Sequence, residues 1–123
     1  MDLPWWLPLG GVPELAPDAL WRALQGPTPP QLVDVRSTPE FESGHIAGAL
    51  SVPITVFPAR LPELALDRAR VVVAICLTAH RSIPAVRLLQ KHGHQAWQLQ
   101  GGMLAWRAAR LPERRAADVG PGA

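Results

Sequence analysis

Cysteine is nearly absent from this chain of 123 residues, in which Cys76 is the only one. A lone cysteine cannot form an internal disulfide, so the sequence does not describe a small secreted scaffold held together by disulfides. A reducing compartment, the cytoplasm, is expected instead. Cys76 must then be either a small buried side chain or a reactive thiol.

Long hydrophobic runs and clusters of like charge are also missing. The uncharged stretch 3–13 is interrupted by Pro4 and Pro8, is too short to cross a bilayer and follows Asp2 rather than a basic segment. Neither a signal peptide nor a membrane span is therefore expected. The net charge is only +2, from 12 basic and 10 acidic residues, and no basic stripe indicates nucleic acid as a partner.

The composition predicts a single packed domain. Hydrophobic residues make up 48% of the chain and charged residues 18%, which is too apolar for a disordered chain, and the length fits one core. We expect residues 1–13 to form an N-terminal extension, residues 14–111 the domain and residues 112–123 a flexible tail with few apolar anchors. Trp5 and Trp6 are expected either to cover the core or to bind a partner.

Short β-branched runs alternate with amphipathic segments along the chain. The predicted strands are residues 32–36, 71–75 and, more weakly, 96–99. The predicted helices are residues 17–24, 38–42, 82–92 and 103–109, with Thr38 as the N-cap of the second. This alternation predicts an α/β domain with a mainly parallel sheet flanked by helices on both faces.

Cys76 follows the most apolar predicted strand and precedes the helix that begins near Arg81. In α/β sheets ligands bind at the carboxyl ends of the strands, where a strand-to-helix turn directs backbone N–H groups and the positive end of the helix into one concavity. Such a site favours an anion and lowers the pKa of a thiol, and Arg81 and His80 add positive potential. We therefore interpret Cys76 as a nucleophile rather than as a core residue.

The sequence also resembles the single-domain rhodanese (sulfurtransferase) family. Four segments carry the resemblance in order: LVDVR (32–36) with PEF (39–41), GHIAGA (44–49), CLTAHRS (76–82) and GGMLAW (101–106). Each segment alone is weak evidence, but the ordered set spans most of residues 14–111 and is highly specific.

The resemblance implies a five-stranded, mainly parallel sheet and a cysteine that receives a sulfane sulfur as a persulfide and passes it to a nucleophilic acceptor. By position, Cys76 would be the sulfur carrier and Arg81 the closing cation of the loop, which would hold the anionic donor. The substrate-binding residues would be Leu77, Thr78, Ala79, His80 and Ser82. The loop 77–80 departs from many members of the family because it has no glycine.

The other matching residues are expected to have structural roles. Asp34 and Arg36 would form an ion pair that supports the site, and Gly44 with His45 a turn with a hydrogen-bonded histidine. Gly101 and Gly102 would form a turn before the last helix, and Trp106 would lie in the core.

Two alternative functions are also compatible with the sequence. The first is a phosphatase or arsenate-reductase-like enzyme on the same scaffold, but four residues separate Cys76 from Arg81, whereas the related phosphatases have one more. The second is a non-catalytic interaction module, in which the cysteine is usually replaced. We expect no cofactor and no metal, because His92 and His94 alone are a weak ligand set. The expected partners are a small donor such as thiosulfate and a thiol or protein acceptor.

Overall fold

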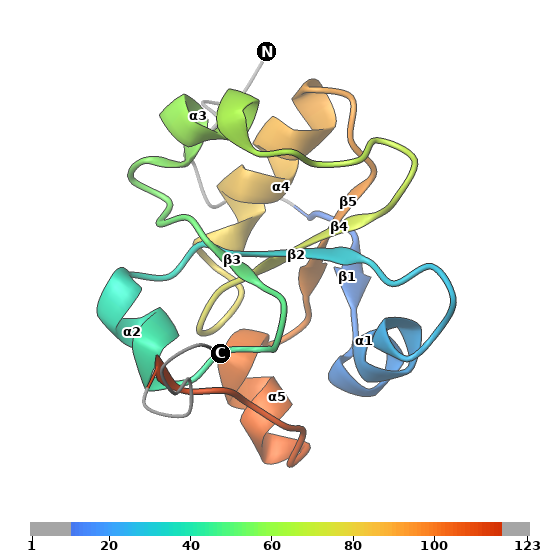
Figure 1. Ribbon diagram of the computed structural model, residues 1–123, viewed down its shortest axis with the longest axis vertical. Helices are drawn as coiled ribbons and strands as arrows, with labels where there is room; N and C mark the ends of the chain where they lie inside the picture. The colour runs from blue at the N-terminus through green and yellow to red at the C-terminus, as the bar shows by residue number, and fades with distance from the viewer. Residues whose placement is uncertain (1–10, 117–123) are drawn as a thin grey trace, which may run out of the picture.

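Five strands lie in the order β1-β5-β4-β2-β3 in the computed structural model, which describes residues 11–116 (Figure 1). Every neighbouring pair in the sheet is parallel. The strands are β1 Glu14–Leu15, β2 Gln31–Asp34, β3 Leu50–Ser51, β4 Val72–Ile75 and β5 Ala96–Leu99. The predicted α/β class is confirmed.

Helices cover both faces of the sheet, as predicted. Their bounds are α1 Pro17–Leu24, α2 Thr38–Ser43, α3 Phe57–Arg60, α4 Ser82–Lys91 and α5 Gly102–Ala108, with a short 3-10 helix at Leu61–Glu63. Figure 1 shows α3 and α4 on one side of the sheet and α1 and α5 on the other. No helix within residues 11–116 is both long and apolar enough to cross a membrane.

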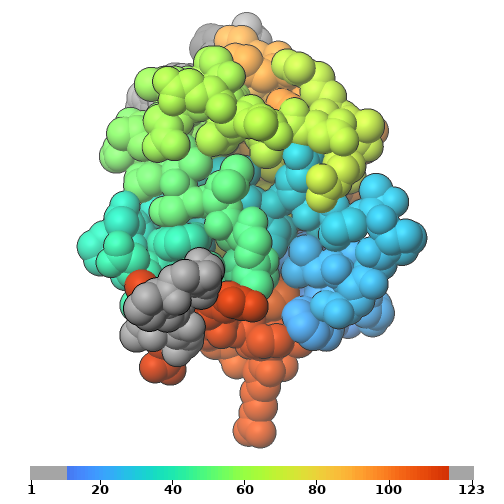
Figure 2. All heavy atoms as spheres, in the orientation of Figure 1, coloured from blue at the N-terminus to red at the C-terminus, as the bar shows by residue number. Residues whose placement is uncertain are grey.

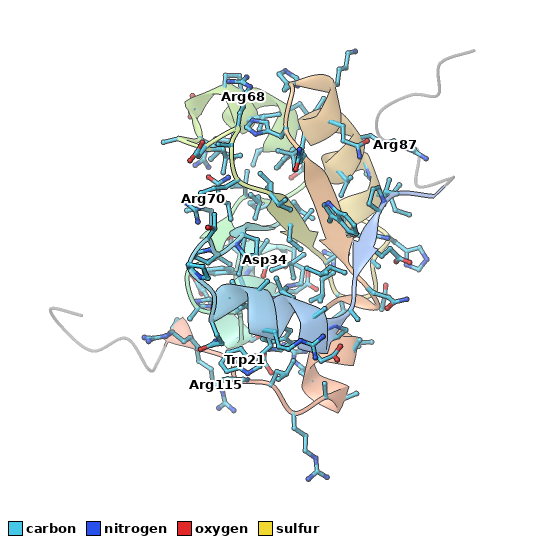
Figure 3. The ribbon with its side chains drawn as sticks, turned by 90° about the vertical axis from the view of Figure 1, so that its right-hand side faces the viewer. Trp21, Asp34, Arg68, Arg70, Arg87 and Arg115 are labelled. Carbon is cyan, nitrogen blue, oxygen red and sulfur yellow. The ribbon has the colours of Figure 1, made fainter. Side chains whose placement is uncertain are left out.

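The central strand β4 is buried on both faces, and its side chains alternate between two hydrophobic cores. Val72 and Ala74 belong to the core beneath α3 and α4, whereas Val73 and Ile75 belong to the core that contains Trp106 of α5. This double burial explains why residues 71–75 are almost wholly apolar. Trp21 of α1 packs edge-on against Trp106, with ring centroids 6.3 Å apart, on the α1 side shown in Figure 3.

Two-residue strands were not detected in the sequence. Pro13 and Leu15 accept backbone hydrogen bonds from Gln98 and Gln100 of the β5 segment, and Val52 donates one to Asp34 of β2. A strand of two residues is too short to show an alternation of polar and apolar side chains, and β1 and β3 therefore have no periodic signal in the sequence. The resemblance, rather than the pattern, supplied the strand number.

The start of α2 differs from the prediction. Ser37, not Thr38, is the N-cap: its hydroxyl accepts from the N–H of Glu40, and the Glu40 carboxylate accepts from the N–H of Ser37. This capping box places Thr38 and Pro39 in the first turn, where proline loses no helical hydrogen bond. Glu40 is thereby fixed at the third helical position.

Residues 112–114, which the prediction assigns to the tail, are in contact with the domain. Arg114 and His45 exchange backbone hydrogen bonds of 2.7 and 2.8 Å, and the indole N–H of Trp106 donates to Pro112 O. Arg107 and Glu113 form an ion pair. The segment is held by hydrogen bonds and an ion pair rather than by apolar contacts. A prediction based on the number of apolar residues could not detect this attachment. The predicted tail beyond it, like Trp5 and Trp6, lies outside the described residues.

A cavity of about 740 Å³ opens between α1, the segment before β3 and residues 112–114. Figure 2 shows this hollow between the blue, green and red atoms. Its lining includes Trp21, Pro30, Ile46 and Leu50, and none of residues 76–82. The cavity is therefore separate from the loop that follows β4.

Candidate active site

Cys76 lies directly after β4, at the point where the connections of the sheet diverge. From β2 the chain passes through α2 to β3 on one side, and from β4 it passes through α4 to β5 on the other. The crevice at such a divergence is where open α/β sheets bind ligands. Figure 1 shows helix α2 and the loop between β4 and α4 at the same end of the neighbouring strands β2 and β4.

Residues 77–81 fold back over the thiol of Cys76, which is 1% exposed. The backbone N–H of Arg81 donates to the Cys76 Sγ at 3.2 Å. The N–H groups of Thr78 and His80 and the side chain of Arg81 also act on the sulfur, because each of them lowers the pKa of the thiol. Helix α4 begins at the next residue, Ser82, so its positive end lies beside the same atom. The loop is therefore a cradle for a sulfur anion.

The pKa of Cys76 reflects two opposing effects. Burial raises the pKa of the thiol, whereas the N–H of Thr78, the Arg81 side chain and the N–H groups of Arg81 and His80 lower it. The donors prevail, and the pKa lies below its ordinary value. A larger fraction of Cys76 is thus the nucleophilic thiolate at neutral pH than for an ordinary cysteine.

Ala79 supplies the conformation for which glycine is usually chosen. Its φ is +67°, in the left-handed region. A residue with a Cβ adopts that region at a cost of roughly 1–2 kcal/mol. The glycine-free loop thus closes around the sulfur with local strain at Ala79.

Helix α5 is hydrogen bonded to the start of the loop that forms the cradle. The N–H groups of Met103 and Leu104 donate to the carbonyls of Cys76 and Leu77 at 2.8 and 3.1 Å. This approach requires glycine at position 102, where φ is +62° and a Cβ would lie 2.5 Å from the Cys76 carbonyl oxygen and also meet Leu77 O. The predicted glycine turn therefore also lets α5 approach the backbone of Cys76 and Leu77, and the hydrogen bonds from α5 fix the orientation of these two carbonyl groups.

Arg81 is held from the other side by Glu40 of α2. Its Nη1 and Nη2 donate to the two carboxylate oxygens of Glu40 at 2.6 and 2.9 Å. The guanidinium lowers the pKa of Glu40 to about 2, and the carboxylate raises the pKa of Arg81. A loop cation that was expected to face the donor is thus already paired with a carboxylate.

Asp34 and Arg36 form the supporting ion pair that the sequence predicts. Both side chains are buried, and Arg36 Nη2 lies 2.8 Å from Asp34 Oδ2. The same nitrogen donates to the carbonyl of Gly44 at 2.7 Å. The pair thereby ties the end of α2 to the end of β2, which fixes the helix that carries Glu40. Figure 3 places Asp34 in the interior of the molecule.

Ser82 does not join the cradle through its side chain. Its hydroxyl is fully buried and donates to Gln98 Oε1 at 2.6 Å, and Gln98 in turn donates to Glu14. A buried hydroxyl needs a partner, and this one finds it in β5. The side chain of Ser82 therefore links α4 to the sheet, and its contact with substrate stays a prediction.

The remaining predicted residues lie as follows. Thr78 and His80 are exposed on the loop, with Thr78 Oγ1 and His80 Nδ1 3.0 Å apart. His45 Nδ1 is hydrogen bonded to Phe41 O, which agrees with the predicted satisfied histidine. Within residues 11–116 no three His, Cys, Asp or Glu side chains are placed to hold a metal.

Residues 16–109 match the family described as Rhodanese-like domain. The chain belongs to this family. The match includes Glu40, Cys76 and Arg81, so the rhodanese-like domain contains the whole cradle. It confirms the resemblance inferred from the four sequence segments.

Related proteins carry different descriptions. The rhodanese-like chain is 43% identical over 93 residues to an HTH-type transcriptional regulator of Mycobacterium tuberculosis, covering 74% of this chain but 40% of the regulator. It is 37% identical to a sulfurtransferase of Allochromatium vinosum, covering 66% of this chain and 75% of that protein. A crystal structure of a rhodanese-like domain protein from Staphylococcus aureus aligns with a TM-score of 0.70 at 29% identity, covering 77% and 91% of the two chains.

Sequence reasoning missed the contact of Glu40 with Arg81. The residue stood within a matching segment, but no role followed from its position at the start of a short helix. One signal was available. Glu40 lies in the helix that follows β2, and β2 is the neighbour of β4, so this helix begins near the loop that follows Cys76.

Proposed function

We propose that this rhodanese-like domain is a sulfurtransferase that carries sulfane sulfur as a persulfide on Cys76. The observation that supports it most is the surroundings of one sulfur atom. The backbone N–H of Arg81 donates to Cys76 Sγ at 3.2 Å, and the N–H groups of Thr78 and His80 and the Arg81 side chain lower the pKa of the thiol. Preorganised donors of this kind stabilise a negative charge without rearrangement during the reaction. The sulfurtransferase named among the relatives supports the same proposal.

The reaction has two displacement steps. In the first, the Cys76 thiolate attacks the sulfane sulfur of the donor, a bond forms between Sγ and that sulfur, and the donor leaves with the electron pair of the broken bond. In the second, a thiol, cyanide or another nucleophile attacks the outer sulfur, and Cys76 leaves as a thiolate. The cradle stabilises the anion on Cys76 before and after each transfer.

Donor and acceptor are both part of the proposal. Thiosulfate or a protein persulfide supplies the sulfur, and a thiol or protein accepts it. A reducing cytoplasm suits a single thiol that must stay free of disulfides between its turnovers.

Loop length favours sulfur transfer over phosphate chemistry. Four residues separate Cys76 from Arg81, and the donors are directed to the Cys76 sulfur itself. A tetrahedral oxyanion at bonding distance would need a wider loop. We therefore expect negligible hydrolysis of an aryl phosphate.

The test is turnover of a sulfane sulfur donor with cyanide, measured as thiocyanate, alongside hydrolysis of an aryl phosphate. The proposal expects thiocyanate from the wild type, none above background from Cys76→Ser, and no phosphate release from either. Aryl phosphate hydrolysis without thiocyanate production would overturn the proposal in favour of oxyanion chemistry.

A further inference from the structure

We propose that the cradle selects a thiol persulfide, R–S–S⁻, as its sulfur donor and discriminates against thiosulfate, because Glu40 compensates the permanent cation of the loop. This inference rests on the proposed function and specifies the donor class at the same site. Two observations support the inference: the charges around Cys76 and the apolar residues at the start of the loop.

The two donors differ by one negative charge at the reacting centre. Attack of the Cys76 thiolate on thiosulfate gives the Cys76 persulfide anion and sulfite, with the sulfur–sulfur bonding pair leaving on sulfite. Attack on R–S–S⁻ gives the same persulfide anion and R–S⁻. The thiosulfate reaction thus gathers three negative charges, whereas the persulfide reaction gathers two. A site that favours thiosulfate must supply the extra positive charge.

The loop does not supply a free permanent cation. Residues 77–80 are Leu, Thr, Ala and His, so Arg81 is the only Lys or Arg between Cys76 and Ser82. Both terminal nitrogens of Arg81 donate to the carboxylate of Glu40. The ion pair has no net charge, and its guanidinium is not free for a second bidentate anion.

Glu40 is itself held in place, so the pairing is built into the fold. Its Oε1 accepts from both the N–H and the hydroxyl of Ser37 in the capping box of α2. At the neighbouring strand end, Asp34 and Arg36 form a second pair, which is buried and also has no net charge. Because Glu40 compensates the charge of the Arg81 side chain that also acts on the sulfur, the uncompensated positive field at Cys76 comes from the backbone N–H groups and the positive end of α4.

Two leucines at the start of the loop expose apolar surface. Leu104 is 51% exposed, and its backbone N–H donates to the carbonyl of Leu77 at the start of the loop. Leu77 is itself only partly buried. An organic group R can remove such surface from water, whereas thiosulfate has no apolar part. Charge and surface thus point to the same class of donor.

The experiment measures the rate at which the full chain gains one sulfur atom, by intact mass, from equal concentrations of thiosulfate and of a freshly prepared alkyl persulfide. The decisive variant is Thr78→Arg, which adds a cation at an exposed position of the loop. Thr78→Gln is the matched control, because it removes the same hydroxyl and adds length without charge. Glu40→Gln is an independent variant, because it removes the compensating charge at another element.

The readout is the ratio of the thiosulfate rate to the persulfide rate in each protein, compared among variants so that the intrinsic reactivity of the donors cancels. We expect the wild type to load faster from the persulfide, and Thr78→Arg to raise the ratio on the order of 10-fold over Thr78→Gln. Glu40→Gln should raise the ratio in the same direction.

Each other outcome decides against the inference. Faster loading of the wild type from thiosulfate overturns it while the sulfurtransferase proposal stands. Equal ratios for Thr78→Arg and Thr78→Gln, or a lower ratio for Glu40→Gln, also overturn it. Failure of the wild type to load from either donor overturns the proposed function itself.

Discussion

Glu40 and Arg81 join helix α2 to the loop before α4 across the ends of β2 and β4, with hydrogen bonds of 2.6 and 2.9 Å. The backbone N–H of the same arginine donates to Cys76 Sγ. A carboxylate far from Cys76 in sequence thus fixes the last residue of the cradle. The buried Asp34–Arg36 pair in turn fixes the helix that carries this carboxylate.

The Glu40–Arg81 pair predicts a specific loss of stability in acid. Because Arg81 lowers the pKa of Glu40 from 4.5 to about 2 in the folded protein, the stabilisation is fully present above pH 4.5 and is lost as the pH falls toward 2. The free energy of unfolding of the wild type should therefore approach that of Glu40→Gln over this range. Denaturant titrations of both proteins at several pH values check it, and a pH-independent difference would contradict it.

Arg81 is expected to affect loading through both its position and its charge. Arg81→Ala should slow sulfur loading on the order of 10-fold to 100-fold, because the cradle loses a donor and its link to Glu40. Arg81→Lys should restore only part of the rate, since an ammonium cannot donate to both carboxylate oxygens in the same fork. Rates from intact mass over time check this prediction. Wild-type rates in both variants would show that the backbone alone forms the cradle.

Ala79 offers a test of strain in the loop. Ala79→Gly should keep the loading activity and leave stability unchanged or raise it by about 1 kcal/mol, because glycine adopts a φ of +67° without steric cost. Ala79→Val should lower both stability and the loading rate, since a β-branched side chain is disfavoured in that region. Urea unfolding and loading rates measure both effects. A stabilising Ala79→Val would contradict the assigned backbone conformation.

Gly102 is expected to tolerate no side chain. Gly102→Ala should cost more than about 2 kcal/mol and slow sulfur loading, because its Cβ would meet the carbonyls of Cys76 and Leu77. Gly11→Ala is the matched control, since a Cβ there meets nothing within 4 Å. Unfolding free energies and loading rates of the two variants check the difference. Equal effects of the two substitutions would remove the support that α5 gives to the cradle.

Strong local patterns allowed much of the fold to be predicted from the sequence. The apolar run 71–75, the helical face of Leu20, Trp21 and Leu24, and the proline and glycine at the ends of α2 each reflect burial or backbone geometry within one element. β1, β3 and α3 are too short to show a period, so the sequence gives no comparable signal for them.

The site was predictable only in part, for a different reason. Cys76 and Arg81 stand five positions apart in one loop, so their proximity follows from the chain itself. Glu40 and Gly102 reach the cradle through tertiary packing, and the hydroxyl of Ser82 turns away to Gln98. A single sequence does not encode such partners in any local spacing.

The intact mass of the protein after incubation with a sulfane sulfur donor tests the central claim most directly. The account predicts that the wild type gains the mass of one sulfur atom, loses it again on addition of cyanide, and that folded Cys76→Ser gains nothing. An unchanged mass of the wild type with persulfide and thiosulfate alike, or an equal gain in Cys76→Ser, would contradict the assignment of Cys76 as the sulfur carrier.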